Sequence, residues 1–352
     1  MKKKIATLTF HWATNYGAVL QAYALQKYLI NQGYQTEIIN YVPWRVTLIQ
    51  RIGWIKNKSS EMFIREKKLE NFRKEYLKRT KKVGFNKYLK QFSDTYDFIL
   101  CGSDQIWNES FTLRGEGKPT LAYFLEFAGE NTKRIAYAVS FGSEMLSREY
   151  KACVSTEFNR FIAISTREIS GKKICHELGK DVCMVCDPTL LLPKAEYIKL
   201  IKKINTSQVF TYILHQHVES EKIAEYILKQ KNCEKISTQQ DGLIEWISRI
   251  YYSELVVTNS FHGVMLSLIL NKPFVAILIK DSGMNDRIKT ILSGVGLEER
   301  IVMECDTKRI DDILNKKIDW LVINHQLDNI RNSGINFLEK SLNNLGSELN
   351  GE

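Results

Sequence analysis

The sequence predicts an α/β protein built from two domains with parallel sheets. Short apolar runs of strand length alternate with longer segments in which apolar residues recur at helical spacing, the order typical of parallel α/β sheets. The chain has 352 residues, enough for two domains of ordinary size. Proline in Asp187-Pro188-Thr189 interrupts regular structure, and the alternation begins again beyond it. We therefore expect a first domain over residues 1–187, a second over 188–310 and a helical tail over 311–352.

The first domain is expected to open with a strand, a loop, a helix and a second strand. Residues 5–10 form an apolar run, and Asn15, Tyr16 and Gly17 then break the pattern. From residue 18 the apolar positions recur at helical spacing until Gly33 ends the helix. Further strands are expected at 36–41, 97–101, 135–140 and 161–164, and further helices at 147–163 and 169–178.

The second domain repeats the alternation of strands and helices. In such domains ligands bind where the carboxyl ends of the strands face a cleft, so the loops that follow the strands are the places to look for a site. Strands are expected at 209–214, 255–258 and 274–277, helices at 219–231, 241–252, 261–270 and 285–294, and a mostly helical tail at 308–345.

Composition and cysteine usage indicate an ordinary globular protein of a reducing compartment. Hydrophobic residues make up 44% and charged residues 26%, which excludes a disordered chain, a collagen-like chain and a coiled-coil rod. The charged and apolar opening stops at His11, too early for an export signal. Seven cysteines, an odd number, fit a reducing cytosol, and Cys183 and Cys186 should point to opposite faces of a strand rather than hold a metal. We expect a cytoplasmic protein with no metal site.

The segment from Asn259 to Gly263 is the strongest candidate for an anion site. It follows a predicted strand and opens a predicted helix, so Ser260 can cap the helix and the free N–H groups of the first turn can hold an anion. His262 would stand at the mouth of that site, where an imidazole suits a general acid. The alternative is a structural histidine that caps a turn.

Arg167 lies between a short apolar strand and a helix. Its guanidinium fork suits a carboxylate or a phosphate. The alternative is a salt bridge to Glu168 or to another acid at the surface.

Two loops of the first domain carry candidate residues for a second ligand. Asn15 and Gly17 lie in the first strand-to-helix loop, where glycine permits close approach of a ligand; the loop is not GxGxxG, so dinucleotide binding is not indicated. The loop after the strand at 97–101 reads Gly-Ser-Asp-Gln-Ile-Trp-Asn, and its polar side chains with Trp107 suit the hydroxyls and the ring face of a sugar. The alternatives are a plain tight turn and a polar loop whose tryptophan belongs to the core.

These segments together resemble the polysaccharide pyruvyl transferase family. Each motif alone is weak, but their order along most of the chain is specific for the family. The motifs are Asn15-Tyr16-Gly17-Ala18-Val19-Leu20-Gln21, the segment 97–108 with Gly-Ser-Asp-Gln-Ile-Trp-Asn, Ala138-Val139-Ser140-Phe141-Gly142, Ser165-Thr166-Arg167-Glu168, Asp187-Pro188-Thr189 and Thr258-Asn259-Ser260-Phe261-His262-Gly263.

The resemblance implies two Rossmann-like domains that face each other across a cleft, as in GT-B glycosyltransferases. It implies transfer of the enolpyruvyl unit of phosphoenolpyruvate onto two hydroxyls of a lipid- or nucleotide-linked sugar, which gives a pyruvate ketal without a cofactor. The donor would lie with the second domain and the acceptor with the first. The family's donor-binding arginine, histidine and lysine fall on Arg167, His262 and Lys280, with His262 as the acid. To these we add, from the loops themselves, Ser260 and Gly263 for the donor and Asn15, Gly17, Gln21, Ser103, Gln105 and Trp107 for the acceptor.

One position departs from the family pattern. Known members carry an aspartate after the glycine of the first loop, where this chain has Ala18. We therefore assign the general base to Asp104 instead. The departure keeps open a different reaction, a GT-B-type glycosyltransferase or another transferase with a phosphorylated donor.

The positive charge of the chain is concentrated in one segment. The net charge is +10, and residues 56–90 hold 13 Lys and Arg against four Glu, so the other residues sum to about +1. That distribution disfavours a nucleic-acid binder. Met62, Leu69, Phe72 and Tyr76 fall near one face of an amphipathic helix. Two interpretations stay open: a solvated helix packed on the first domain, or a patch that docks on the inner face of the plasma membrane.

Overall fold

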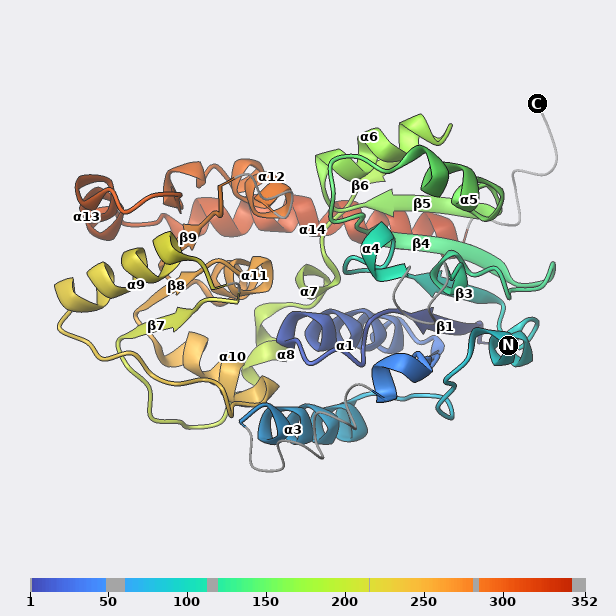
Figure 1. The fold of residues 1–352 in the computed structure, drawn as a ribbon, viewed down its shortest axis with the longest axis horizontal. Helices are drawn as coiled ribbons and strands as arrows, with labels where there is room; N and C mark the ends of the chain where they lie inside the picture. The colour runs from blue at the N-terminus through green and yellow to red at the C-terminus, as the bar shows by residue number, and fades with distance from the viewer. Residues whose placement is uncertain (1, 49–60, 113–119, 215, 281–284, 344–352) are drawn as a thin grey trace.

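The computed structural model describes residues 2–48, 61–112, 120–214, 216–280 and 285–343. Within these ranges the strands form two parallel sheets, one of six strands and one of four. The sheets lie in separate halves of the molecule, each flanked by helices (Figure 1). The predicted α/β class with parallel sheets is confirmed.

The first sheet has the strand order β2-β1-β3-β4-β5-β6. The order reverses at β1, so the loops after β1 and β3 flank the switch point where α/β sheets bind ligands. The strands are β1 (Lys4–Leu8), β2 (Gln35–Ile38), β3 (Phe98–Cys101), β4 (Lys133–Val139), β5 (Phe161–Thr166) and β6 (Cys183–Met184). The helices are α1 (Tyr16–Asn31), α3 (Glu61–Tyr76), η1 (Asn86–Phe92), α4 (Glu109–Thr112), η2 (Ala122–Phe124), α5 (Arg148–Asn159) and α6 (Ile169–Glu177).

The second sheet has the strand order β10-β9-β8-β7. Two short helices, α7 (Pro188–Leu191) and α8 (Lys194–Ile198), connect it to the first sheet, so the expected boundary at Asp187 falls between the two sheets. The strands are β7 (Val209–Tyr212), β8 (Leu255–Thr258), β9 (Phe274–Ile277) and β10 (Ile301–Val302). The helices are α9 (Val218–Gln230), α10 (Leu243–Tyr252), α11 (Phe261–Leu270), α12 (Asp286–Val295), η4 (Glu298–Arg300), α13 (Thr307–Asn315) and α14 (Trp320–Asn343).

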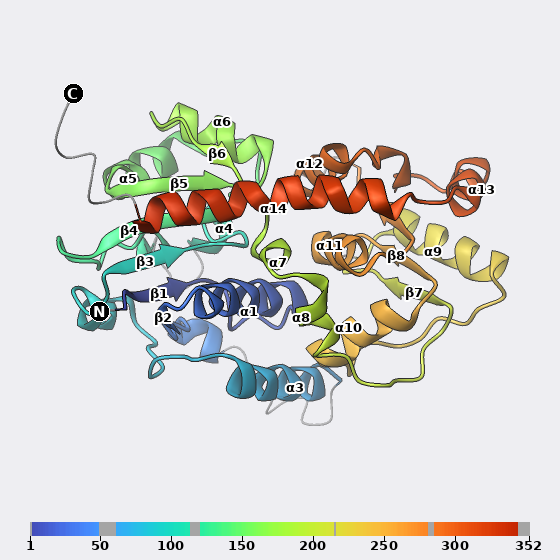
Figure 2. The same ribbon diagram turned by 180° about the vertical axis from the view of Figure 1, so that it is seen from behind.

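Two helices join the halves. Helix α14 passes behind both sheets and contacts β5, α7 and α12 (Figure 2). Helix α1 contacts α10 and α11 of the second half, and Tyr16 at its start stacks on Trp246 with ring centroids 5.1 Å apart. One hydrophobic core cluster therefore contains residues of both halves and holds them in a fixed relation.

Helix α3 lies within the basic segment 56–90 and packs this segment against the first half of the protein. Leu69 and Phe72 are buried, and Phe72 meets Tyr23 of α1 at 5.6 Å between ring centroids. Arg73 is fully buried and forms an ion pair with Glu66 at 2.7 Å. The apolar face expected for α3 thus packs on the first half, except Met62, which is exposed. Residues 56–60 of the expected insertion lie outside the described residues.

None of the helices described here is long and apolar enough to cross a bilayer.

Candidate functional site

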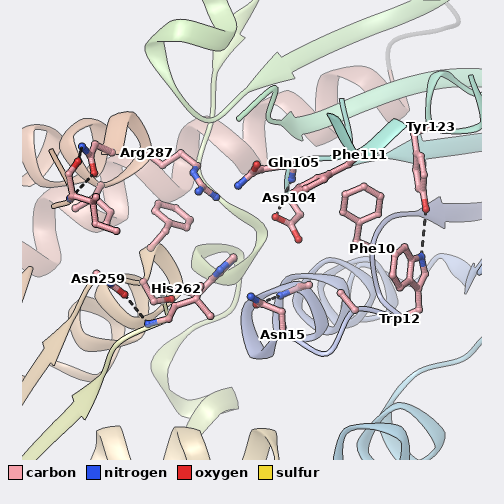
Figure 3. Close-up of a pocket in the computed structure, with 18 of the residues that line it drawn as sticks. Phe10, Trp12, Asn15, Asp104, Gln105, Phe111, Tyr123, Asn259, His262 and Arg287 are labelled. Carbon is pink, nitrogen blue, oxygen red and sulfur yellow. Dashed lines mark hydrogen bonds between the residues drawn. The ribbon is translucent and has the colours of Figure 1, made fainter. Parts of the chain in front are cut away.

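A cavity of about 370 Å³ lies where the carboxyl ends of both sheets face each other. The first sheet contributes the loops after β1 and β3, and the second contributes the loops after β7, β8 and β9. This is the place where parallel α/β sheets bind their ligands. We call it the interdomain cavity. Its lining residues include Phe10, Trp12, Asn15, Ala18, Asp104, Gln105, Phe111, Tyr123, Asn259, Ser260, His262, Asn285 and Arg287 (Figure 3).

The start of helix α11 supplies one side of the cavity. Ser260 has extended backbone and its Oγ accepts a hydrogen bond from Gly263 N at 3.4 Å, so the predicted N-cap is confirmed. Gly263 is required by packing rather than by a ligand, because a Cβ there would lie 2.7 Å from Thr258 Oγ1. His262 is 7% exposed and lines the cavity together with Ser260. The helix start thus directs its dipole and an imidazole at the same space.

His262 is positioned by residues of both halves. A Cβ on Gly17 would lie 1.9 Å from His262 Nδ1, so the glycine makes room for the imidazole rather than for a ligand, contrary to the expectation for Gly17. On its other side, His262 Nε2 lies 3.7 Å from Asp187 Oδ2 and has no hydrogen-bond partner among the residues that the structure describes.

Asp187 links His262 to Arg167. Its Oδ2 lies 2.5 Å from Arg167 Nη1 and accepts a hydrogen bond from Ser103 Oγ at 3.1 Å. Burial alone would raise the pKa of Asp187, but His262 and Arg167 hold it far below its usual range. The carboxylate is therefore charged and gives the imidazole a fixed negative neighbour. Asp187 was expected only to mark a domain boundary.

Arg167 lies behind the cavity wall and is not among the residues that line it. It is 5% exposed, pairs with Asp187 and lies 4.9 Å from the centroid of the Phe261 ring. The salt-bridge interpretation therefore describes its contacts, although the acid is buried rather than at the surface. Its Nε and Nη2 have no hydrogen-bond partner among the described residues, and its expected contact with a ligand stays a prediction.

The cation that does reach the cavity is Arg287, in the first turn of α12. It is 9% exposed, its Nε has no hydrogen-bond partner within the described ranges, and its guanidinium lies 5.6 Å from the Phe261 ring centroid. Burial and the nearby Arg167 lower the pKa of Arg287 to about 10, so it stays protonated at neutral pH. A buried N–H group without a hydrogen-bond acceptor destabilises the folded protein unless a ligand accepts a hydrogen bond from it.

Lys280, the lysine expected to bind the donor, is exposed and does not line the cavity. Sequence reasoning missed Arg287 in its place. The signal was present, because Arg287 interrupts the otherwise apolar buried stripe of α12 formed by Ile288, Ile291 and Val295.

Three of the expected polar residues of the first domain line the cavity: Asn15, Asp104 and Gln105. Asn15 caps α1, with its Oδ1 accepting from Ala18 N at 3.2 Å. Asp104 adopts a positive φ of 65° and keeps its carboxylate 3.8 Å from Arg167 Nη2. The loop after β3 therefore presents one carboxylate and one amide to the cavity.

The remaining three expected acceptor residues, Gln21, Ser103 and Trp107, are buried and make contacts inside the protein. Gln21 donates to Thr9 Oγ1 at 2.9 Å and accepts from Ser103 N at 3.3 Å, which ties the loops after β1 and β3 together. Trp107 is fully buried, stacks on Phe124 at 4.7 Å and donates to Tyr123 O at 3.0 Å. The expectation that Trp107 forms a sugar platform is wrong, because no face of its ring reaches the cavity.

An aromatic wall missed from the sequence takes that place. Phe10, Trp12, Phe111 and Tyr123 line the cavity on the side of the first sheet (Figure 3). Phe10 meets the other three at ring-centroid distances of 4.9 to 5.9 Å, and Trp12 Nε1 donates to Tyr123 Oη at 3.3 Å. We call these four residues the aromatic end, and Asn259, Ser260, His262 and Arg287 the cationic end.

Metal-binding side chains do not gather anywhere in the described ranges: no group of three or more His, Cys, Asp or Glu residues could hold an ion. Cys183 is exposed and Cys186 is buried, and both are free thiols.

Comparison with solved structures shows the same fold at very low identity. HepE of Anabaena, solved in complex with UDP and glucose, is 10% identical with a TM-score of 0.51, over 98% of this chain and 100% of that chain. A UDP-N-acetylglucosamine 2-epimerase of Rickettsia bellii is 8% identical with a TM-score of 0.50, over 97% and 99% of the two chains. These similarities concern the fold, which is GT-B-like as expected.

No curated protein matches this sequence significantly. A family model does: the model described as polysaccharide pyruvyl transferase matches residues 15–281. The matched range contains the loops after β3 and β8 and includes His262, Asp187 and Arg167, whereas Phe10 and Trp12 lie before it and Arg287 lies beyond it. The chain therefore belongs to the polysaccharide pyruvyl transferase family.

Proposed function

We propose that this protein transfers the enolpyruvyl group of phosphoenolpyruvate onto two hydroxyls of a sugar in a cell-surface polysaccharide precursor, where it forms a pyruvate ketal. The observation that carries the proposal is the division of one cavity into a cationic end and an aromatic end. Membership in the family supports a transferase of polysaccharide synthesis. The reaction would take place in the cytoplasm, where phosphoenolpyruvate is available.

The donor occupies the cationic end in this proposal. Phosphoenolpyruvate carries a phosphate and a carboxylate close together, and each needs a positive partner. Arg287 offers a buried guanidinium whose Nε has no hydrogen-bond partner in the described part of the chain, and the capped start of α11 at Ser260 offers helix N–H groups. Arg167 acts through Asp187 as a positioning residue.

His262 is the proposed general acid. It delivers a proton to the methylene carbon of the donor, which leaves a cationic centre on the carbon that carries the phosphate. A sugar hydroxyl attacks this centre, the C–O bond to phosphate breaks, and a second hydroxyl attacks the same carbon to close the ketal. Of the two hydroxyl protons, one replaces the proton that His262 gave up and the other leaves with phosphate. The carboxylate of Asp187 stabilises the protonated imidazole before transfer.

Asp104 is the proposed base for the attacking hydroxyl, and it passes the proton that it accepts to the leaving phosphate. Figure 3 shows Asp104 between the two ends, and Ala18, which stands where family members carry an aspartate, lines the same cavity. The aromatic end then holds the apolar face of the acceptor sugar. The alternative donor is a nucleotide sugar, which would also place a phosphate against Arg287.

The proposal is tested by incubating the protein with phosphoenolpyruvate and a panel of lipid-linked and nucleotide-linked sugars. We expect release of inorganic phosphate together with a mass gain of one pyruvyl unit on one acceptor. Turnover of a nucleotide sugar without use of phosphoenolpyruvate would overturn the proposal in favour of a glycosyltransferase.

A further inference from the structure

A second cavity, of about 630 Å³, lies between helix α3 and the segment that follows β2. Residues Phe63, Lys67, Asn71 and Lys74 line it from α3 at intervals of three or four, so one face of the helix forms its floor. Trp12 lines this cavity and the interdomain cavity alike. We call it the basic cavity.

The lining of the basic cavity has a surplus of positive charge. Five of its residues are Lys or Arg and two are Glu, so the balance is +3. Arg73 and Arg79 form ion pairs with Glu66 and Glu70, which uses both carboxylates. The surplus therefore resides in lysines.

Lys67 and Lys74 contribute two of these three charges from α3. They lie seven residues apart, two helical turns along one face, and both are exposed. Two ammonium groups on one face of a concave site attract an anion with several oxygens.

The basic cavity is held in a fixed relation to the interdomain cavity. Arg73 donates hydrogen bonds to His11 O and to Ala13 O, each at 2.8 Å, so it binds the backbone on both sides of Trp12. The same arginine is anchored in α3 by Glu66. Helix α3 and the loop that carries Trp12 therefore form one rigid unit, and an anion against α3 lies just beyond the aromatic end.

We propose that the basic cavity binds the phosphoryl group through which the acceptor sugar is attached to its carrier. The inference rests on the proposed function: a sugar against the aromatic end would leave the interdomain cavity past Trp12, and its anomeric phosphate would then meet Lys67 and Lys74. A concave site with Trp12 and Phe63 in its walls suits a phosphorylated group that enters it better than a flat lipid surface. The inference thus assigns the linking phosphate of the acceptor to a site on α3, separate from the donor's phosphate at the cationic end.

The test is a calorimetric titration of inorganic pyrophosphate into the full-length protein without donor or sugar. We expect the variant Lys67→Gln/Lys74→Gln to bind pyrophosphate at least tenfold more weakly than the natural protein, with an unchanged melting temperature because both side chains are exposed. The matched variant Lys87→Gln/Lys90→Gln removes two exposed lysines outside the cavity and should keep the affinity within about twofold.

Arg287→Ala separates the two cavities in the same titration. Pyrophosphate binding that survives in this variant supports the basic cavity, and binding that disappears would show that the anion occupies the donor end, which overturns the inference. Unchanged affinity in the Lys67→Gln/Lys74→Gln variant overturns it too. If that variant instead loses only its binding to phosphatidylglycerol vesicles, the patch is a membrane-docking surface. Because no donor is present, failure of the transfer reaction leaves this result standing, and the reverse also holds.

Discussion

The two ends of the interdomain cavity are built by different means. The cationic end comes from the first turns of two helices of the second half, where Ser260, His262 and Arg287 project beside helix N-termini. The aromatic end comes from the strand exit after β1 and from the segments around Phe111 and Tyr123. Charge and apolar contact are thus supplied by separate halves of the molecule, so the two ends of the cavity can be perturbed independently.

The two ends also differ in what supports them. The buried ion pair of Arg167 and Asp187 lies behind the cationic end. Replacing one partner by a neutral residue would leave the other as an uncompensated buried charge. Behind the aromatic end lie stacked rings, with Trp107 against Phe124. The ion pair positions the His262 imidazole by electrostatic attraction, whereas the stacked rings support the aromatic end by packing.

The largest expected effect is at His262. His262→Ala should lower kcat for transfer by on the order of a hundredfold or more, because one positioned acid typically contributes that much. Steady-state phosphate release measures it, and circular dichroism checks that the variant is folded. His176→Ala removes an exposed histidine and should leave kcat unchanged. An active His262→Ala protein would remove this residue as the acid.

Arg287→Ala should raise the KM for phosphoenolpyruvate by roughly ten- to a hundredfold, the range for loss of a charged hydrogen bond. The KM for the acceptor should stay unchanged, because the arginine lies at the other end. Lys280→Ala is the control, since Lys280 is exposed and outside the cavity lining. The opposite outcome, a large effect of Lys280 and none of Arg287, would return the donor to the position expected from the sequence.

The stability of the protein should depend on pH through His11, which lies between Phe10 and Trp12 of the aromatic end in the sequence. Burial lowers the pKa of His11 to about 4, below its ordinary value of 6.5. As pH falls from 7 to 5, His11 binds a proton in the unfolded chain but stays neutral in the folded chain. The free energy of unfolding should therefore fall by about 2 kcal/mol. Urea unfolding at the two pH values measures it.

In a His11→Gln variant the residue no longer titrates, so the free energy of unfolding should lose this part of its pH dependence. The depressed pKa of Asp187 does not interfere, because its stabilising effect is lost only at much lower pH. Equal pH slopes in the two proteins would contradict the assignment.

The smallest effect is expected at Phe111. Phe111→Ala should raise the KM for the acceptor about fivefold and leave the KM for phosphoenolpyruvate unchanged, because one aromatic contact is worth about 1 kcal/mol. Phe111 is 41% exposed, so folding should tolerate the change. Phe85→Ala, at 42% exposed and away from the cavity, is the matched control. A raised donor KM would show that the two ends are not separate.

The sequence predicted the order of strands and helices well, because buried parallel strands and amphipathic helices leave strong periodic signals. The cap at Ser260 and the placement of His262 also followed from local rules, since a helix that begins directly after a strand can project its first residues only at the edge of the sheet. The prediction was weaker where a residue's direction depends on distant segments.

Trp107 and Trp12 illustrate that limit. Both follow strands of the first sheet, but Trp107 turns inward because Phe124, Phe141 and Phe158 surround it, and those contacts come from later in the chain. Lys280 and Arg287 differ likewise, since only the packing of α12 against Phe261 brings the arginine into the cavity. The spacing of Ile288, Ile291 and Val295 indicates that Arg287 lies on the buried face of α12, but the sequence alone does not show that this face meets the cavity.

The most direct test of the two-ended cavity is a crystal structure of the protein with phosphoenolpyruvate bound. We predict that the phosphate or the carboxylate lies within hydrogen-bond distance of Arg287 and of the first N–H groups of α11, with the His262 imidazole facing the methylene carbon. The aromatic end should remain open for a sugar. A donor seated against Phe10 and Trp12, or outside the cavity beside Lys280, would contradict the account.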